Sequence, residues 1–401
     1  STPSNSSAAS DVYKRQELSG EDIMLAAPTG RAAKRMSETT GYEARTIHRM
    51  LELNGGMEGN AGFERNEQNP LETNLIIIDE MSMVDISIMN SLLKAVSIGT
   101  KLILVGDVDQ LPSVGPGNVL KDIIESGCFP VVKLERIFRQ AAQSEIIINA
   151  HKINRGEEVV LNKYSKDFLF VHRNGADNII NAMKTLIKDK LPDYVGADVY
   201  DLQILTPSRK SNVGVERLNK IMQDFLNPAD AIKQERQVGD VTFREGDKVM
   251  QIKNDYQLAW EKRSRYGIPT EQGTGAFNGD TGVIERISTF DENVTVKFED
   301  GRFVTYEFSQ LDELELAYAI TVHKSQGSEY PAVIIPMSQG PRMLMNRNIL
   351  YTAVTRARKC VCLVGEEEIF RLMADNVSES KRYSSLTDRI EEIRHIEDFG
   401  Q

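Results

Sequence analysis

Short apolar runs, each followed by polar residues, organise the first part of the chain. The runs are 23–27, 75–78 and 101–105. Unbroken apolar runs of this length predict strands that are covered on both faces, as in parallel sheets. A helical pattern over 86–96 lies between the last two runs, so the sequence predicts a βαβ unit here. Ligands bind such sheets at the carboxyl ends of the strands.

A second group of apolar runs predicts another parallel sheet further along the chain. These runs are 202–205, 332–335 and 361–364. Between them the pattern changes to short alternating segments separated by turn residues, at 281–284, 294–298 and 303–306. Alternation of this kind is typical of antiparallel strands. The predicted fold class is therefore α/β, with two parallel-sheet domains and a small β-barrel inserted in the second.

Three segments depart from this pattern. Residues 1–20 are small, polar and aperiodic, which predicts a disordered leader. Residues 53–73 contain four glycines, which disfavours a helix and predicts a hairpin or a mobile loop. Residues 366–401 are highly charged and are predicted to be helical in part.

Composition excludes several classes of protein. The 401 residues are 40 % apolar and 27 % charged, which excludes wholesale disorder and a collagen-like chain. No apolar run is long enough to span a membrane, and residues 1–16 contain no signal-peptide core. The three cysteines cannot form a disulfide framework or a four-thiolate zinc site. A reducing cytoplasmic setting is the simplest expectation.

Charge is distributed unevenly. The net charge of −11 disfavours nonspecific binding of nucleic acid. Residues 316–364, however, contain six Lys or Arg residues and one acid, whereas residues 365–401 contain five Lys or Arg residues and ten acids. A local basic surface can bind phosphates even on an acidic protein.

The polar residues after the first strands suggest phosphate chemistry. Asp79 and Glu80 follow run 75–78. One carboxylate can hold Mg²⁺, and the next can deprotonate a water that attacks a γ-phosphate. Asp107 and Gln110 follow the next predicted strand, where an amide can sense that phosphate. The alternatives are an acidic turn that caps a strand and a tight Gly-Pro turn.

Other candidates carry positive charge or hydroxyl groups. Arg139 and the pair Arg356 and Arg358 could deliver a guanidinium to a γ-phosphate, although most arginines are solvated or ion-paired at the surface. Segment 321–329 suits phosphodiester contacts, or it is an ordinary helix end and loop. Segments 28–32 and 46–48 could contact a single strand, or Thr29 could simply cap a helix.

Aromatic residues are sparse. Four of them lie near the predicted barrel, namely Tyr256, Trp260, Tyr266 and Phe277. They could stack on bases, but packing in a core is the more common use of such residues.

Five blocks of sequence occur in a characteristic order along the chain. They are DEMSMVD (79–85), GDVDQLPSVGPGNVL (106–120), IFRQ (137–140), TVHKSQGSEY (321–330) and YTAVTRAR (351–358). This order resembles that of superfamily-one DNA helicases, and APTGRAAKRM (27–36) followed by TIH (46–48) looks like their motif Ia region. The chain is most similar to RecD-like helicases, relatives of the exodeoxyribonuclease V alpha chain, over about residues 23–365.

The resemblance implies roles for individual residues. Asp79 resembles the acid that coordinates Mg²⁺, and Glu80 resembles the catalytic base. Gln110 resembles the γ-phosphate sensor. The remaining implied catalytic residues are Arg139 and Arg356, which would reach the γ-phosphate from the second motor domain. The implied nucleotide-binding residues are Asp107, Gly327, Glu329, Arg139 and Arg356. The implied DNA-binding residues are Pro28, Thr29, Arg31, His48, Thr321, His323 and Lys324.

The resemblance also implies an organisation and a function. The expected parts are a leader (1–22), an incomplete first RecA-like domain (23–135) with a hairpin insertion (51–72), a second RecA-like domain (136–242 with 317–370), an SH3-like barrel (243–316) and a charged tail (371–401). The implied activity is 5′-to-3′ movement on single-stranded DNA, with ATP and Mg²⁺ as cofactors. Duplex junctions and subunits of a recombination complex are the other implied partners, and no membrane is expected.

One family feature is missing from these 401 residues. A P-loop, GxxxxGK[ST], should precede the motif Ia region and cradle the phosphates, but the sequence contains none. We therefore expect a chain truncated on its amino side that hydrolyses ATP poorly or not at all. Two alternatives stay open: a module that binds single-stranded DNA or a partner without turnover, and a nuclease. The nuclease is disfavoured because no further acids cluster around Asp79 and Glu80.

Overall fold

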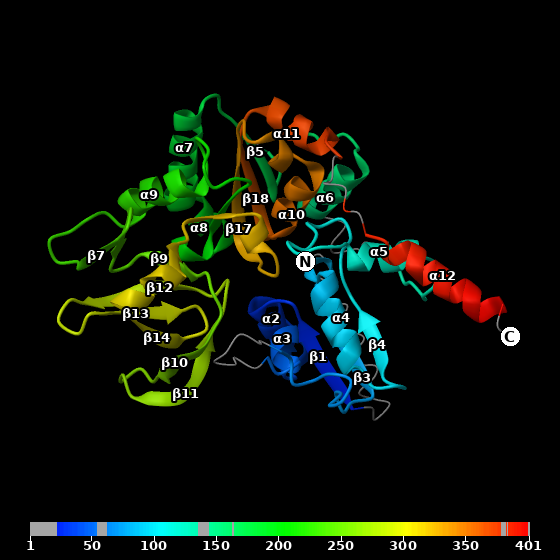
Figure 1. Cartoon of the computed structure of the whole chain (residues 1–401). Helices are drawn as coiled ribbons and strands as arrows, with labels where there is room; N and C mark the ends of the chain where they lie inside the picture. The colour runs from blue at the N-terminus through cyan, green and yellow to red at the C-terminus, as the bar shows by residue number, and fades with distance from the viewer. Residues whose placement is uncertain are drawn as a thin grey trace. The chain divides into compact units, whose positions relative to one another are not determined.

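The computed structural model describes residues 22–53, 62–134, 144–162, 164–377, 382 and 384–399. The chain forms two compact units, coloured by residue number in Figure 1. The first unit comprises Ser1–Gln143 and Ser378–Gln401, and the second comprises Ser144–Val377. Among the described residues, no helix is long and apolar enough to cross a membrane.

A four-stranded parallel sheet forms the centre of the first unit. Its strands are β1 (Ile23–Ala27), β2 (Ala44–Thr46), β3 (Leu75–Ile78) and β4 (Lys101–Leu104), in the order β2-β1-β3-β4. All four residues of β3 are buried, because β3 has a neighbour on each side and is covered on both faces. The three strands predicted from apolar runs are confirmed. Strand β2 was not predicted, because its sequence contains no apolar run.

Short helices flank this sheet. They are α2 (Gly30–Thr40), α3 (Ile47–Met50), α4 (Ile86–Ala95), α5 (Val119–Glu125) and α12 (Leu386–Phe399). Helix α4 begins where the Asp85 carboxylate accepts a hydrogen bond from the backbone N–H of Ile88. Its buried residues Met89 and Leu92 pack in one cluster with alternate residues of β3, so α4 covers one face of the sheet (Figure 1).

The second unit contains a five-stranded parallel sheet. Its strands are β5 (Phe168–His172), β6 (Gln203–Thr206), β16 (Ala319–Thr321), β17 (Tyr330–Met337) and β18 (Ala357–Gly365), in the order β16-β6-β17-β18-β5. The helices of this unit are α6 (Glu145–Arg155), α7 (Ala176–Thr185), a π-helical stretch (Leu186–Lys190), α8 (Leu191–Val195), α9 (Val215–Leu226), α10 (Arg347–Thr355) and α11 (Glu367–Asp375).

An antiparallel region of seven strands is inserted before β16. Its strands are β9 (Lys248–Gln251), β10 (Asp255–Arg263), β11 (Pro269–Ala276), β12 (Thr281–Ser288), β13 (Asn293–Phe298), β14 (Arg302–Glu307) and β15 (Leu314–Leu316). Strands β7 (Glu235–Val238) and β8 (Val241–Arg244) form a separate hairpin. The predicted fold class, with two parallel sheets and an antiparallel SH3-like region, is confirmed.

Residues 131–134 form no strand although three of the four are apolar, and the Val132 side chain is 86 % exposed. The charged segment 371–401 is helical in part, as expected, and it divides between the units: α11 belongs to the second and α12 to the first. Leu386 at the start of α12 packs against the core cluster of the first unit, and Thr387 donates a hydrogen bond to the Asp122 carbonyl in α5.

Arg382 anchors this returning segment. Its Nη1 donates to the Ser113 hydroxyl at 3.1 Å and to the carbonyls of Gly115 at 2.7 Å and Gly117 at 2.8 Å. On its other side, the same loop accepts the Ile86 N–H at the Pro116 carbonyl. The loop is close-packed there, because a Cβ added to Gly115 would overlap the Asp85 carboxylate. One guanidinium therefore satisfies the polar atoms of a tight loop from the far end of the chain.

Arg382→Ala is expected to lower the free energy of unfolding of the first unit by about 2–3 kcal/mol, because it leaves part-buried carbonyls without donors. Thermal unfolding and hydrogen exchange of residues 113–117 would measure this. Arg389→Ala is the matched control, since Arg389 lies exposed on α12. Equal stability and exchange in the two variants would show that Arg382 holds nothing in place.

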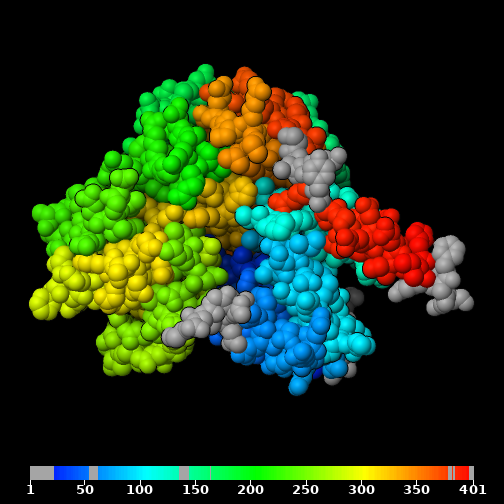
Figure 2. Space-filling view, in the orientation of Figure 1, coloured from blue at the N-terminus to red at the C-terminus, as the bar shows by residue number. Residues whose placement is uncertain are grey.

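Figure 2 shows α12 as a red ridge at the surface of the first unit, and its residues 391–396 are exposed. The helix attaches mainly through its first turns, and Arg394 in a later turn donates a hydrogen bond to the Gly127 carbonyl at 3.2 Å.

Candidate functional site

Asp79 and Glu80 lie at the carboxyl end of β3, where both are buried. The backbone fixes them between two neighbouring strand ends. The Asp79 N–H donates to the Ala26 carbonyl of β1 at 3.0 Å, and the Met81 N–H donates to the Val105 carbonyl after β4 at 2.9 Å. The sequence thus places two carboxylates at the middle of the sheet edge, as predicted from the apolar run and the two acids that follow it.

Glu80 has an unusual backbone. Its φ of 54° and ψ of 40° lie in the left-handed region, which costs a residue with a side chain roughly 1–3 kcal/mol. A hydrogen bond of 2.8 Å from the Glu80 N–H to Asp79 Oδ1 supports this turn. Strained residues of this kind gather at functional sites, because the surrounding structure must over-determine them.

Burial and the proximity of the two carboxylates also make their ionisation unfavourable. Burial, and then the charge of Glu80, raise the pKa of Asp79 to about 7, although the Glu80 N–H and Arg35 act in the opposite direction. Arg35 Nη2, from α2, lies 3.7 Å from Glu80 Oε1. Two buried acids therefore share one nearby cation, an arrangement that further positive charge would stabilise.

Three buried polar atoms at this edge have no hydrogen-bond partner within the described part of the chain. They are Glu80 Oε2, Ser82 Oγ and Gln110 Oε1. Unsatisfied buried acceptors are rare in proteins and point to a bound water, ion or ligand. The described residues contain no group of three or more His, Cys, Asp or Glu side chains that could hold a metal. Mg²⁺ still fits the carboxylates, because it is commonly held by one or two carboxylates, waters and substrate phosphates.

Asp107 positions Gln110 rather than standing free. Asp107 Oδ2 accepts from Gln110 Nε2 at 3.3 Å, and Asp107 Oδ1 accepts from the Asp109 N–H at 3.0 Å. The amide nitrogen is thereby occupied and the amide oxygen is left for a ligand. Gly106 allows this close approach of the two strand ends, since a Cβ there would lie 2.6 Å from Leu120 and 3.1 Å from Met81.

The predicted DNA residues of the first unit lie at the ends of β1 and β2. Thr29 caps α2 by accepting the Ala32 N–H at 3.2 Å, which is the structural alternative that the sequence left open. Pro28 precedes it and Arg31 lies in the first turn of α2. His48 lies in α3 with its ring centroid 5.8 Å from that of Phe63. Burial lowers the pKa of His48 despite the charge of Asp85, so its imidazole is neutral at pH 7.

The predicted DNA residues of the second unit follow the carboxyl end of β16. Thr321 pairs in register with Thr206 of β6 and accepts the Lys324 N–H at 3.3 Å. His323 begins a 3₁₀ turn (His323–Ser325), and burial lowers its pKa. It can therefore donate or accept a hydrogen bond at neutral pH but adds no positive charge. Lys324 supplies the charge, and its Nζ lies 2.7 Å from Glu315 Oε2.

The predicted nucleotide residues of the second unit lie at the opposite edge of the same sheet. Arg356 immediately precedes β18 and is 3 % exposed. Its guanidinium donates to the carbonyls of Thr352 at 3.2 Å and Ser328 at 3.3 Å. Gly327 has a φ of 74°, and Glu329 accepts a hydrogen bond from Arg358 at 2.8 Å. Segment 321–330 therefore runs from the carboxyl edge of a parallel sheet to its amino edge.

One predicted site residue, Arg139, lies outside the described residues, as do residues 54–61 of the predicted hairpin. An antiparallel bridge joins Leu53 to Phe63 on either side of that gap.

The sequence also missed several partners. Arg35 contacts Glu80, Glu315 contacts Lys324, and Arg209 contacts Glu315 in turn, and no local pattern marks these three residues. Arg358 was noted only for its place beside Arg356.

Three family models match the chain. One described as an AAA domain matches residues 7–116, and one described as an ATP-dependent RecD-like DNA helicase SH3 domain matches residues 218–298. One described as a UvrD-like helicase C-terminal domain matches residues 316–364. The second match in particular makes this chain similar to RecD-like DNA helicases. The AAA match begins inside the segment predicted as a leader (1–22), so it gives the predicted truncation no support.

Curated relatives agree with this similarity. The chain is 33 % identical over 374 residues to the ATP-dependent RecD2 DNA helicase of Deinococcus radiodurans, covering 93 % of this chain and 47 % of the relative. It is 30 % identical over 393 residues to the RecBCD enzyme subunit RecD of Mycobacterium tuberculosis, covering 90 % and 64 %. The RecD-like chain thus spans about half to two thirds of the length of these relatives.

Solved structures share the fold of the RecD-like chain. A structure of two Pif1 helicases at forked double-stranded DNA has a TM-score of 0.53 and 21 % identity, and covers 99 % of this chain and 92 % of its own. Bacteroides Pif1 with ADP-AlF₃ and single-stranded DNA has a TM-score of 0.50 and 20 % identity, with 94 % and 88 % covered.

Proposed function

We propose that this RecD-like chain forms the core of an ATP-dependent DNA helicase that moves 5′-to-3′ on single-stranded DNA. The observation that carries the proposal is the buried pair Asp79 and Glu80, with unpartnered buried oxygens beside it. The Deinococcus relative, named as an ATP-dependent DNA helicase, supports the assignment.

The residues divide the chemistry between them. Asp79 would hold Mg²⁺, which when bound neutralises charge on the phosphates. Glu80 Oε2 would accept the proton of the attacking water, because this atom has no partner within the described chain. Asp107 would keep the Gln110 amide turned so that its oxygen meets the water or the phosphate. Arg356, and by resemblance Arg139, would spread the charge that develops on the γ-phosphoryl group.

Coupling between nucleotide and strand would run through segment 321–330. Its first residues, Thr321 to Lys324, suit phosphodiester contacts at one sheet edge, and its last, Gly327 to Glu329, lie against Arg356 at the other. Movement of Arg356 towards a phosphate would therefore pull on the turn that bears His323. Binding and release of nucleotide would alternate the grip on the strand.

Two finer proposals follow from the resemblance. Duplex junctions would meet the hairpin segment 51–72, and forked DNA is what the Pif1 relative was solved with. Partner subunits in a recombination complex would follow the mycobacterial relative, which is named as a RecBCD subunit. The rival function, a module that binds single strands without turnover, is favoured by the lack of a GxxxxGK[ST] sequence in these 401 residues.

Binding of fluorescent oligo-dT tests the proposal. His323→Ala is expected to weaken binding about tenfold, roughly the worth of one hydrogen bond. The logarithm of affinity should fall by ~0.7 per phosphate contact per log unit of salt. His395→Ala, on the exposed face of α12, is the matched control. An affinity that changes with neither the salt concentration nor His323→Ala would reject the proposed strand contacts.

A further inference from the structure

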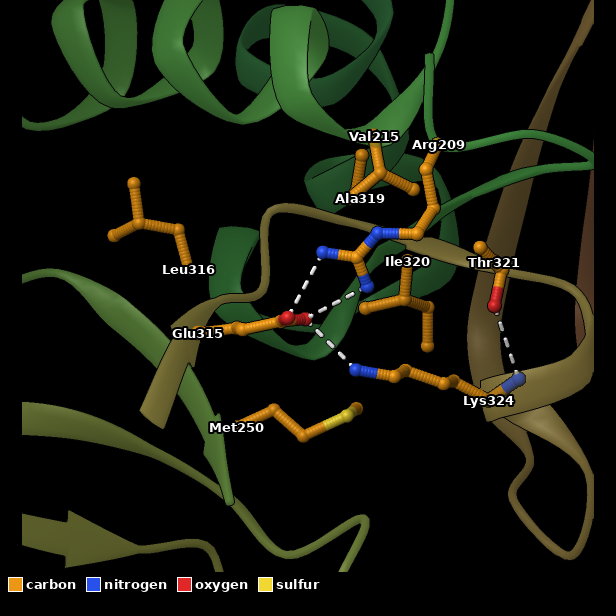
Figure 3. A pocket seen from close by; sticks show the side chains of 9 residues that line it. All are labelled: Arg209, Val215, Met250, Glu315, Leu316, Ala319, Ile320, Thr321 and Lys324. Atoms are coloured by element: carbon orange, nitrogen blue, oxygen red, sulfur yellow. Dashed lines mark hydrogen bonds and ion pairs between the residues drawn. The ribbon is translucent and has the colours of Figure 1, made fainter. Parts of the chain in front are cut away.

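A cluster of three charged side chains joins the antiparallel region to the parallel sheet within the second unit (Figure 3). Glu315 comes from β15, which pairs with β9. Arg209 follows β6, and Lys324 lies in the turn after β16. Three different elements thus bring two cations to one carboxylate.

The contacts are close and divide the two carboxylate oxygens between the cations. Arg209 Nη2 lies 2.8 Å from Glu315 Oε1, and Arg209 Nη1 lies 3.3 Å from Glu315 Oε2. Lys324 Nζ lies 2.7 Å from Glu315 Oε2. Although burial acts in the opposite direction, the bonds from Arg209 and Lys324 lower the pKa of Glu315. The carboxylate is therefore ionised at neutral pH, and the cluster carries one net positive charge.

Neither cation is closed off from solvent. The Arg209 side chain is 46 % exposed and the Lys324 side chain 26 %, so solvent reaches part of each. A free lysine has three donors and four rotatable bonds, and ordering such a side chain costs conformational entropy. Glu315 removes that freedom before any ligand arrives, which is the usual basis of preorganised binding.

We propose that Arg209 and Lys324 form one phosphate subsite for the DNA strand and that Glu315 is the positioning residue which holds both cations in place for it. The proposal rests on the proposed function, because the phosphate belongs to the strand that His323 is inferred to contact. It adds Arg209 and Glu315 to the strand site and gives the antiparallel region a part in it, through β15.

The sign of one substitution tests the proposal. Simple electrostatics predicts that removing an acid near a phosphate strengthens binding. Positioning predicts the reverse, so Glu315→Gln should weaken oligo-dT binding by the 401-residue chain about five- to tenfold. Its salt slope should fall by up to ~0.7. Glu216→Gln is the matched control, since Glu216 reaches Arg209 only at 4.0 Å and is half exposed; its affinity should be unchanged or slightly stronger.

Further variants separate the possible failures. Lys324→Ala and Arg209→Ala should each weaken binding, and Glu315→Gln should add little once Lys324 is Ala, because positioning acts through that lysine. Thermal unfolding shows whether the Glu315→Gln variant is folded. If it is misfolded, Arg209→Ala decides: weaker binding by that variant supports the subsite, and an affinity equal to that of the wild type overturns it. Tighter or equal binding by folded Glu315→Gln, with Lys324→Ala weakened, overturns the positioning role alone. A wild-type chain that does not bind oligo-dT overturns the proposed function and this inference together.

Discussion

ATP turnover by the 401-residue chain is expected to be no faster than turnover by its Glu80→Gln variant, with or without oligo-dT. The reason is the lack of a P-loop in these residues, since its backbone N–H groups and lysine normally cradle the phosphates. Glu80→Gln keeps the shape of the side chain and removes the proposed base. If the chain does not bind the phosphates of ATP, loss of the proposed base cannot lower the turnover rate any further.

A coupled assay for ADP release would measure this, with the Deinococcus relative as the positive control. DNA-stimulated turnover in the wild type would contradict the expectation. In that case Glu80→Gln should reduce turnover by about 10²–10⁴-fold, the usual worth of a general base. Wild-type turnover that Glu80→Gln leaves intact would remove Glu80 from the proposed mechanism as well.

The parts of the fold that were predictable are those set by local burial. Strand β3 reads as four apolar residues because it is covered on both faces, and the acids after it mark the sheet edge. Strand β2, with the sequence Ala-Arg-Thr, carries no such mark, since it is a short edge strand defined by its pairing with β1. Its position follows from tertiary structure and not from its own residues.

The candidate site was predictable in residue type but not in contacts. The positions of Asp79 and Gln110 followed from two strand ends. The left-handed backbone of Glu80 did not, because nothing local favours glutamate at positive φ. The ion pair of Lys324 with Glu315 was also hidden, although only nine residues separate them, since it depends on how β15 turns into β16.

The rule that sites follow carboxyl ends of strands applied to only part of the second unit. It places Thr321 and His323, but Arg356 and Glu329 precede their strands. Identification of these residues depended on the resemblance to helicase motifs. The docking of α12 was likewise invisible, because its contacts link residues more than 250 positions apart.

Asp79→Asn is expected to stabilise the first unit at pH 8. Burial and Glu80 raise the pKa of Asp79 to about 7, above the value near 3.9 of an unfolded chain. Between those values the folded state binds more protons than the unfolded state, so stability falls as pH rises from about 4 to about 7. The loss approaches ~4 kcal/mol at most, at 1.36 kcal/mol per pKa unit. Asparagine stays neutral and can still accept the Glu80 N–H, so the variant avoids the loss.

Thermal unfolding between pH 4.5 and 8 would measure the difference, at roughly 2–4 °C per kcal/mol. Asp388→Asn, on the exposed side of α12, is the isosteric control and should follow the wild type. Mg²⁺ should raise the wild-type midpoint at pH 8, because a cation that binds only the folded carboxylates stabilises that state, and should raise Asp79→Asn less. A wild-type profile that is flat with pH and no less stable than Asp79→Asn would show that the two buried acids are not in electrostatic conflict.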